Sequence, residues 1–204
     1  MKNMKKLLVT AFMPFGGDVI NPTELVLNKL PDELNGVMIN KLLLPVEYIK
    51  AKELIKNEYD KITPDAVIML GQAGRREEIS IERIAKNLMD AKIADNSGYL
   101  ATSELIKDGG DNIFSTLPVE EINEAINKGN IKSNISDDAG SFVCNYVFYN
   151  MLDYNKGRVP TGFIHVPFIL EQGHSEYPSM ALNDIYKGII KAIEVVIEKI
   201  KNGQ

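Results

Sequence analysis

The chain has 204 residues, of which 45% are hydrophobic and 25% charged, and this composition excludes a disordered or fibrous protein. Its formal net charge of −5 argues against a nucleic acid or an anionic membrane surface as the main partner. The single cysteine cannot form an internal disulfide, so we expect a cytoplasmic protein with a free thiol. Because no stretch approaches the roughly 18 uninterrupted apolar residues of a membrane-spanning helix, we expect no membrane segment.

Strands and helices are predicted to alternate along the chain. In chain order they are a strand at 6–12, helices at 23–30 and 46–59, a strand at 67–70, helices at 119–127 and 139–152, a strand at 163–168 and a helix at 179–201. The three strands are apolar runs bounded by Pro or Gly, which is typical of central strands buried on both faces. Several helices have Pro at or just before their first turn. The last helix has an apolar stripe near the 3.6-residue period, which predicts packing on a sheet; the stripe consists of Ile185, Ile189, Ile193, Val196, Ile197 and Ile200.

This alternation predicts a single α/β domain over residues 1–204, with helices on both faces of a mostly parallel central sheet. Residues 94–114 differ, because they contain the turn-forming runs Asn96-Ser97-Gly98 and Asp108-Gly109-Gly110-Asp111. We expect this segment to be a loop or hairpin that leaves the main layers.

Cys144 stands near the start of the helix predicted at 139–152. Asp138 or Ser141 could cap that helix, which would place the thiol in or near its first turn. The unpaired backbone N–H groups and the helix dipole stabilise a thiolate there, and the thiolate is the nucleophilic form of cysteine. The alternative is a small buried hydrophobic residue, because a lone cysteine in an apolar helix usually has that role.

The chain has two histidines. His165 lies near the carboxyl end of the strand at 163–168, where the ligand sites of open α/β sheets form. A core histidine with both ring nitrogens hydrogen-bonded is the alternative. His174 follows Gly173 and is expected in a loop.

Glu82 lies in the alternating run at 79–85, which predicts a strand with Glu82 on the same side as Ser80. A carboxylate among β-branched residues is costly unless it has a partner. Arg83, a solvated edge or an imidazole could serve as that partner. The charged run at 75–78 is expected to be a solvated turn.

Two glycine turns follow predicted strands, at Gly16-Gly17 and at residues 71–74. Neither has the Lys-Ser/Thr ending of a P-loop or the three-glycine spacing of a dinucleotide site, so tight turns fit them better than a phosphate or nucleotide site. No pair of His or Cys residues stands at metal-ligand spacing, and we expect no metal site.

Several blocks of the sequence occur together in a fixed order. They are residues 10–17 (TAFMPFGG) with 21–22 (NP), 71–75 (GQAGR), 79–85 (ISIERIA) with Asn87, 95–96 (DN), 114–118 (FSTLP), 139–145 (AGSFVCN) and 162–167 (GFIHVP). In this order they resemble the pyroglutamyl-peptidase I family, also called pyrrolidone-carboxylate peptidases, over residues 7–182. The resemblance implies a three-layer α/β sandwich of the phosphorylase/hydrolase-like type.

The resemblance also implies an activity and the residues that carry it. Members of that family are cytoplasmic cysteine peptidases that remove an N-terminal pyroglutamyl residue from peptides without a cofactor. Their catalytic Glu, Cys and His fall on Glu82, Cys144 and His165. The resemblance also implies an apolar slot for the flat, neutral lactam. The residues that would line this slot, bond the lactam or lie beside it are Phe12, Phe15, Gln72, Lys92, Ile93, Phe142 and Val143. Homo-oligomers, dimers or tetramers, are expected by the same resemblance, with residues 94–114 as a candidate contact arm.

The chain departs from the family pattern at Lys92, where bacterial members usually have Arg, and at Asp137, where they often have Asn. Lysine keeps the charge but loses the planar fork of arginine, and Asp137 would add a negative charge close to Cys144. A silent homologue that only binds pyroglutamyl peptides is therefore one alternative. A related cysteine hydrolase of different specificity is another.

Overall fold

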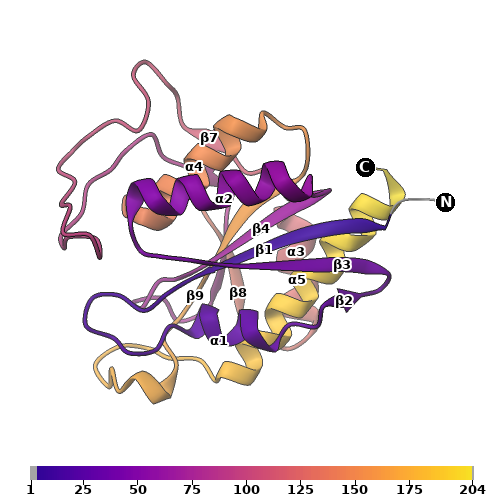
Figure 1. Ribbon diagram of the computed structural model, residues 1–204. Helices are drawn as coiled ribbons and strands as arrows, with labels where there is room; N and C mark the ends of the chain where they lie inside the picture. The colour runs from indigo at the N-terminus through magenta and orange to yellow at the C-terminus, as the bar shows by residue number, and fades with distance from the viewer. Residues whose placement is uncertain (1–3, 204) are drawn as a thin grey trace.

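The computed structural model describes residues 4–203. Its centre is a seven-stranded sheet in the order β2-β3-β1-β4-β9-β5-β8, and Figure 1 shows helices on both sides of it. The strands of this sheet are β1 (Lys5–Phe12), β2 (Glu33–Leu34), β3 (Val37–Leu44), β4 (Ala66–Gln72), β5 (Ile79–Glu82), β8 (Ser133–Ser136) and β9 (Thr161–Val166). A separate two-stranded sheet consists of β6 (Ile84–Ala85) and β7 (Ile113–Phe114).

The helices form the two outer layers. They are α1 (Pro22–Lys29), α2 (Tyr48–Ile62), α3 (Val119–Lys128), α4 (Val143–Asn155) and α5 (Leu182–Asn202), with a short 3₁₀ turn, η1 (Leu170–Gln172). One apolar cluster joins the sheet to α1, α3 and α5, and a second joins the opposite face to α2 and α4. The structure thus confirms the predicted α/β architecture with two helical layers.

The sheet is mostly parallel, as predicted. β1 pairs in parallel with β3 and β4, β4 with β9, and β5 with β8. Only the β5–β9 and β2–β3 pairs of the described sheet are antiparallel. The central strands β4 and β9 are buried along their whole length, which accounts for their near-continuous apolar sequences.

The helix predicted at 179–201 is confirmed as α5, and each of its six stripe residues is at most 5% exposed. The other predicted helices also form, but two begin later than expected. The helix predicted from residue 46 begins at Tyr48, where the carboxylate of Asp95 accepts the backbone N–H. A cap supplied by a residue so far along the chain leaves no local sequence signal.

The helix predicted from residue 139 begins at Val143, and neither Asp138 nor Ser141 caps it. Asp138 instead accepts the N–H of Gly140, which has a φ of +77°. Ser141 donates its hydroxyl to the carbonyl of Asp90. Asp138 is therefore used for a turn within this loop, and Ser141 ties the loop to the segment at Asp90.

The strand predicted at 79–85 is shorter in the structure, because β5 ends at Glu82. Beyond it, Ile84 and Ala85 pair with β7 in the small sheet. The sequence analysis also missed β3 and the polar strand β8, both of which depend on a neighbouring strand for their hydrogen bonds.

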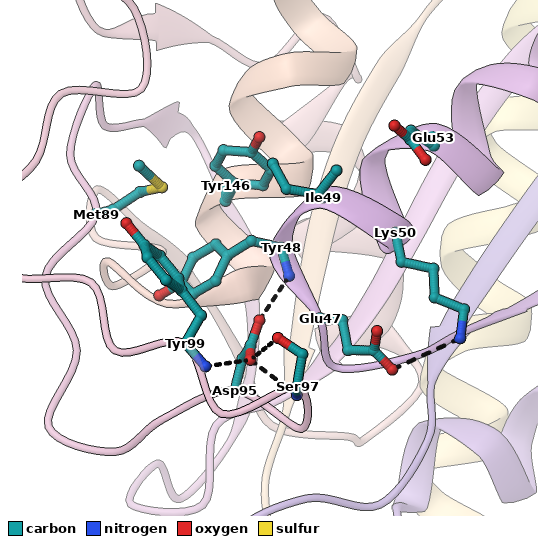
Figure 2. Close-up of a pocket in the computed structure, with 10 residues that line it drawn as sticks. All are labelled: Glu47, Tyr48, Ile49, Lys50, Glu53, Met89, Asp95, Ser97, Tyr99 and Tyr146. Carbon is teal, nitrogen blue, oxygen red and sulfur yellow. Dashed lines mark hydrogen bonds and ion pairs between the residues drawn. The ribbon is translucent and has the colours of Figure 1, made fainter.

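The segment 94–114 is largely irregular, as predicted, and short hydrogen bonds attach it to the helical layer. Asp95 accepts bonds from the backbone of Tyr48, Ser97 and Tyr99 and from the Ser97 hydroxyl, and Figure 2 shows these contacts. Asn87 similarly binds the backbone of Lys107 at both ends of its amide. The segment is therefore held in place although it has little secondary structure.

Candidate active site

Three chemically active side chains, predicted from distant parts of the sequence, meet near the ends of the central strands β4 and β9. His165 is near the end of β9, Glu82 is the last residue of β5, and Cys144 is the second residue of α4. The Nδ1 of His165 lies 2.7 Å from Oε1 of Glu82. Of the three partners considered for Glu82, the structure therefore shows the imidazole.

The strand register explains this pair. In the antiparallel ladder between β5 and β9, His165 lies opposite Ser80, and Glu82 lies opposite Phe163. His165 and Glu82 are thus diagonal neighbours on one face of the sheet, within reach of each other's side chains. Because β5 runs against its neighbour, a carboxylate and an imidazole 83 positions apart become a buried pair.

Gly71 makes room for the thiol. It pairs with His165 in the parallel ladder between β4 and β9. A Cβ atom at this position would lie 2.7 Å from Cζ of Phe163 and 2.9 Å from Sγ of Cys144, which is closer than real Cβ contacts. The sulfur of Cys144 therefore rests against the backbone of β4 beside the histidine strand.

The start of α4 offers free hydrogen-bond donors next to Cys144. Phe142, the residue before the helix, has an extended backbone, and its side chain accepts no capping hydrogen bond. The first N–H groups of any helix have no partner within the helix. Here they belong to Val143, Cys144 and Asn145, the first three residues of α4. The buried Asn145 amide anchors this end of the helix by bonds to the backbone of Lys86 and Leu88.

Glu82 is kept ionised. Its side chain is fully buried, and burial alone would raise the pKa of its carboxyl. The hydrogen bond from His165 and the favourable electrostatics of His165 and the Arg76 guanidinium outweigh that effect and lower the pKa below its ordinary value. An ionised Glu82 can only accept, so Nδ1 of His165 carries a proton and Nε2 is the nitrogen left for Cys144.

Burial of the thiol acts against the thiolate that the helix start is expected to stabilise. Burial raises the pKa of Cys144 to about 12, with the charge of Glu82 acting in the same direction. Arg76 opposes this shift but does not cancel it. Among the described residues, Cys144 and His165 form no hydrogen bond with each other. Such contacts often tighten only when substrate binds.

Cys144 and His165 line one open cavity of about 350 Å³. Three residues expected to bind substrate also line it, Phe15, Gln72 and Phe142. The rings of Phe15 and Phe142 lie 5.9 Å apart and form an aromatic wall. The nucleophile, the histidine and part of the expected slot are therefore in one place.

The other residues expected at the substrate lie outside that lining. Phe12 and Val143 are buried in the core, where Phe12 packs on Phe163, whose ring contacts His165. Ile93 is 46% exposed near Gly16, and Lys92 is exposed. The structure brings Phe12 and Val143 behind the cavity rather than into it.

Arg76 is a residue of the site that the sequence analysis missed. It was expected in a solvated turn, but its Nη1 lies 2.6 Å from Oε1 of Glu82 and its Nη2 donates to the carbonyl of Asp138. It also lines the cavity. The only sequence signal for a role in the site was its position just after β4, because the site lies at the end of that strand.

The charge of Asp137 does not stand unpaired beside the nucleophile. Its carboxylate accepts two hydrogen bonds from Arg83, at 2.7 and 2.6 Å. Arg83, considered earlier as a partner of Glu82, is therefore occupied by Asp137. The charge at this position is compensated by Arg83, which lies between β5 and β6.

A larger hollow of about 690 Å³ lies elsewhere, between α2 and the segment 94–114 (Figure 2). It contains none of the three catalytic candidates. Tyr48, Tyr99 and Tyr146 form much of its wall, with Asp95 bonded at its base.

Within residues 4–203, side chains that commonly ligate metals form no cluster of three. No helix of that part of the chain has the length and apolar character needed to cross a membrane.

Comparison with known proteins gives consistent results. A family model described as pyroglutamyl peptidase matches residues 5–199. A pyrrolidone-carboxylate peptidase of Fusobacterium nucleatum is 45% identical over 199 residues, covering 95% of this chain and 93% of that protein. The pyrrolidone carboxyl peptidase of Thermococcus litoralis matches with a TM-score of 0.93 at 35% identity, over 98% of this chain and 97% of that one. The pyroglutamyl peptidase I of Bacillus amyloliquefaciens matches with a TM-score of 0.91 at 35% identity, over 95% and 96%.

Proposed function

The chain belongs to the pyroglutamyl peptidase family and removes N-terminal pyroglutamate from peptides, and we propose that Cys144, His165 and Glu82 carry out this reaction. The observation that supports the assignment most directly is the buried His165–Glu82 pair behind a cavity that the only cysteine also lines. A nucleophile, a base and a group that orients the base are the parts that covalent acyl transfer requires.

The first step is attack by sulfur. Nε2 of His165 removes the thiol proton as Sγ bonds to the pyroglutamyl carbonyl carbon, because burial raises the pKa of the thiol. Glu82 stabilises the imidazolium that forms and holds the ring in the required tautomer. The backbone N–H groups at the start of α4 are available for the negative charge on the carbonyl oxygen.

The second half of the reaction releases both products. The imidazolium of His165 gives its proton to the leaving amine as the C–N bond breaks, which leaves a thioester on Cys144. Water then attacks the thioester, with His165 again as the base, and free pyroglutamate leaves. Charge and protons balance over the cycle, so these side chains need no further reactant.

The cavity suits a neutral lactam. Phe15 and Phe142 offer an apolar wall, and Gln72 provides polar atoms beside it. An ordinary N-terminus would bring a charged amine into this site, where its desolvation is not compensated. The preference for pyroglutamate over free N-terminal residues follows from this difference.

The assignment is tested with a pyroglutamyl-anilide substrate. We expect Cys144→Ser, His165→Ala and Glu82→Gln each to lower kcat/KM by about a hundredfold or more, with the fold retained by circular dichroism. Glu77→Gln is the matched control, because this exposed carboxylate lies in the turn before β5. Undiminished turnover in the Cys144 or His165 variant would refute the assignment, and an inactive wild-type protein would favour the silent homologue.

A homo-oligomer, dimer or tetramer, is part of the same proposal. The segment 94–114 carries large apolar side chains that are between 44% and 61% exposed; they are Tyr99, Leu100, Leu105 and Phe114. Such a group favours burial against a second copy. Light scattering on the wild type and on Leu105→Lys tests this, and identical monomeric masses would contradict it. The cytoplasmic location stays a prediction.

A further inference from the structure

Gln72 is a neutral polar residue that lines the cavity, and its amide has two chemically opposite ends. It is the last residue of β4, next to Gly71 and beside the catalytic histidine strand. The oxygen of the amide accepts hydrogen bonds and the nitrogen donates them. Which end faces the substrate therefore decides what the cavity recognises.

Gln172, in the 3₁₀ turn after β9, has an amide orientation set by backbone groups of unambiguous role. Its Oε1 accepts the N–H of Ile169 at 3.0 Å, and its Nε2 donates to the carbonyl of Ile20 at 3.2 Å. An N–H can only donate and a carbonyl can only accept, so the Gln172 amide cannot be reversed without losing both bonds. Asp18 Oδ2 also lies 3.2 Å from this nitrogen, as an acceptor that shares one of its two hydrogens.

The orientation of Gln72 follows from that of Gln172. The nitrogen of Gln172 lies 2.9 Å from Oε1 of Gln72, so the oxygen of Gln72 is occupied by a donor. The Gln72 nitrogen has one weak partner among the described residues, Asp18 Oδ2 at 3.5 Å, the outer limit of a hydrogen bond. An N–H of Gln72 is therefore left for a ligand in the cavity.

Asp18 is itself held on its far side. His174 Nε2 lies 2.7 Å from Asp18 Oδ1, and the His174 ring stacks on Phe168 at 4.1 Å between centroids. The Phe168 ring in turn lies so close to Gly74 that no Cβ would fit there. The loops after β1, β4 and β9 are thus locked together around the Gln72 amide.

We propose that Gln172 is a specificity-determining positioning residue, which orients the Gln72 amide so that its N–H donates to the lactam carbonyl of the substrate. This rests on the proposed function and adds the origin of its selectivity. Gln172 itself lines no part of the cavity and acts through Gln72. A substrate analogue whose five-membered ring has no carbonyl leaves the Gln72 N–H unpaired. Sites built to hydrogen-bond a substrate group reject analogues that lack that group.

The test compares two activated esters, the p-nitrophenyl esters of pyroglutamate and of cyclopentanecarboxylate. Both rings are neutral and of the same size, and both esters are reactive enough for acylation of Cys144 to be measured. The ratio of their kcat/KM values reports recognition of the lactam, whereas the cyclopentane ester alone reports whether the catalytic groups are intact.

Two substitutions address Gln172. Gln172→Glu replaces the donating NH₂ with an acceptor, so that Gln72 must turn its nitrogen away from the cavity, and Gln172→Met removes both polar atoms at similar volume. We expect the ratio to fall roughly 10- to 100-fold in Gln172→Glu and about tenfold in Gln172→Met, with little change for the cyclopentane ester. Glu171→Gln, an exposed neighbour in the same turn, should leave the ratio unchanged.

A double variant separates orientation from packing. In a Gln72→Ala background, adding Gln172→Met should not lower the ratio further, because the group that Gln172 orients is gone. Equal losses on both esters, an unchanged ratio in both single variants, or a further loss in the double variant would each overturn the inference. If the wild type does not prefer pyroglutamate at all, the proposed function fails instead, so the two failures are distinguishable.

Discussion

Arg76 should contribute to stability and to catalysis at once, because it binds the carboxylate that orients His165. The substitution Arg76→Met keeps an unbranched apolar stem but removes the guanidinium. Oε1 of Glu82 would then have His165 as its one partner, and Oε2 already has none among the described residues. The carbonyl of Asp138, in the loop before Cys144, would lose its donor as well.

The size of the effect follows from the burial of this ion pair. Breaking a buried pair by removing one partner costs about 3–5 kcal/mol. Glu82 is fully buried, but the Arg76 side chain remains 25% exposed, so water replaces part of the lost interaction. We therefore expect a loss of about 2–3 kcal/mol in the free energy of unfolding. For a chain of this size, that corresponds to a Tm lower by about 4–12 °C.

The pH dependence gives an independent readout of the same contact. The folded-state pKa of Glu82 lies below its ordinary 4.5, so its contribution to stability is present above pH 4.5 and is lost as the pH falls through the folded-state value. Without Arg76, one of the charges that lower this pKa is gone. The unfolded-state pKa is the same in both proteins, so the loss of stability on acidification should be smaller in the variant and complete at a higher pH than in the wild type.

Thermal unfolding followed by circular dichroism between pH 3 and pH 8 measures both effects, and kcat/KM with a pyroglutamyl-anilide should drop about 10- to 100-fold as the His165–Glu82 geometry loosens. Arg75→Met is the matched control, since Arg75 lies over the Tyr177 ring at 5.5 Å and touches no catalytic group. If the Arg76 variant unfolds within about 1 °C of this control at every pH, the reasoning is wrong.

Three other predictions concern neighbouring features. Gly71→Ala should cost about 1–3 kcal/mol of stability and lower kcat/KM by about a hundredfold, since the new Cβ would push on Phe163 and on the thiol. An active, equally stable variant would show that the space beside β4 is not needed. Alkylation of Cys144 by iodoacetamide should be slower than that of free cysteine at pH 7 and should still accelerate above pH 9, because burial raises the pKa of the thiol to about 12. An alkylation rate that reaches a plateau below pH 8 would contradict this. Asp95→Ala should expose the segment 94–114 to limited proteolysis, because the donors of Tyr48 and its other partners lose their acceptor, and an unchanged cleavage pattern would argue against that anchor.

The site residues that could be found from the sequence are those with rare chemistry or a recognisable local context. Cys144 is the only cysteine, and His165, one of two histidines, lies near the end of an apolar strand, so few candidates were possible. Glu82 stood out because a carboxylate in a β-branched run needs a partner. Arg76 lacked such a signal, because one arginine in a charged turn has the same sequence context whether its side chain is solvated or paired.

The sequence by itself determined the α/β class, the buried central strands, the amphipathic face of α5 and the family, because these depend on apolar periodicity and on short motifs that persist along the chain. Tertiary structure alone decided which partner Glu82 takes, that Asp95 caps α2, and that Gln172 orients Gln72. Each of those contacts joins residues that are distant in sequence, and strand order and register, rather than local preference, bring them together. The raised pKa of the Cys144 thiol has the same origin, since a pKa depends on the burial and charges that the folded chain places around the group.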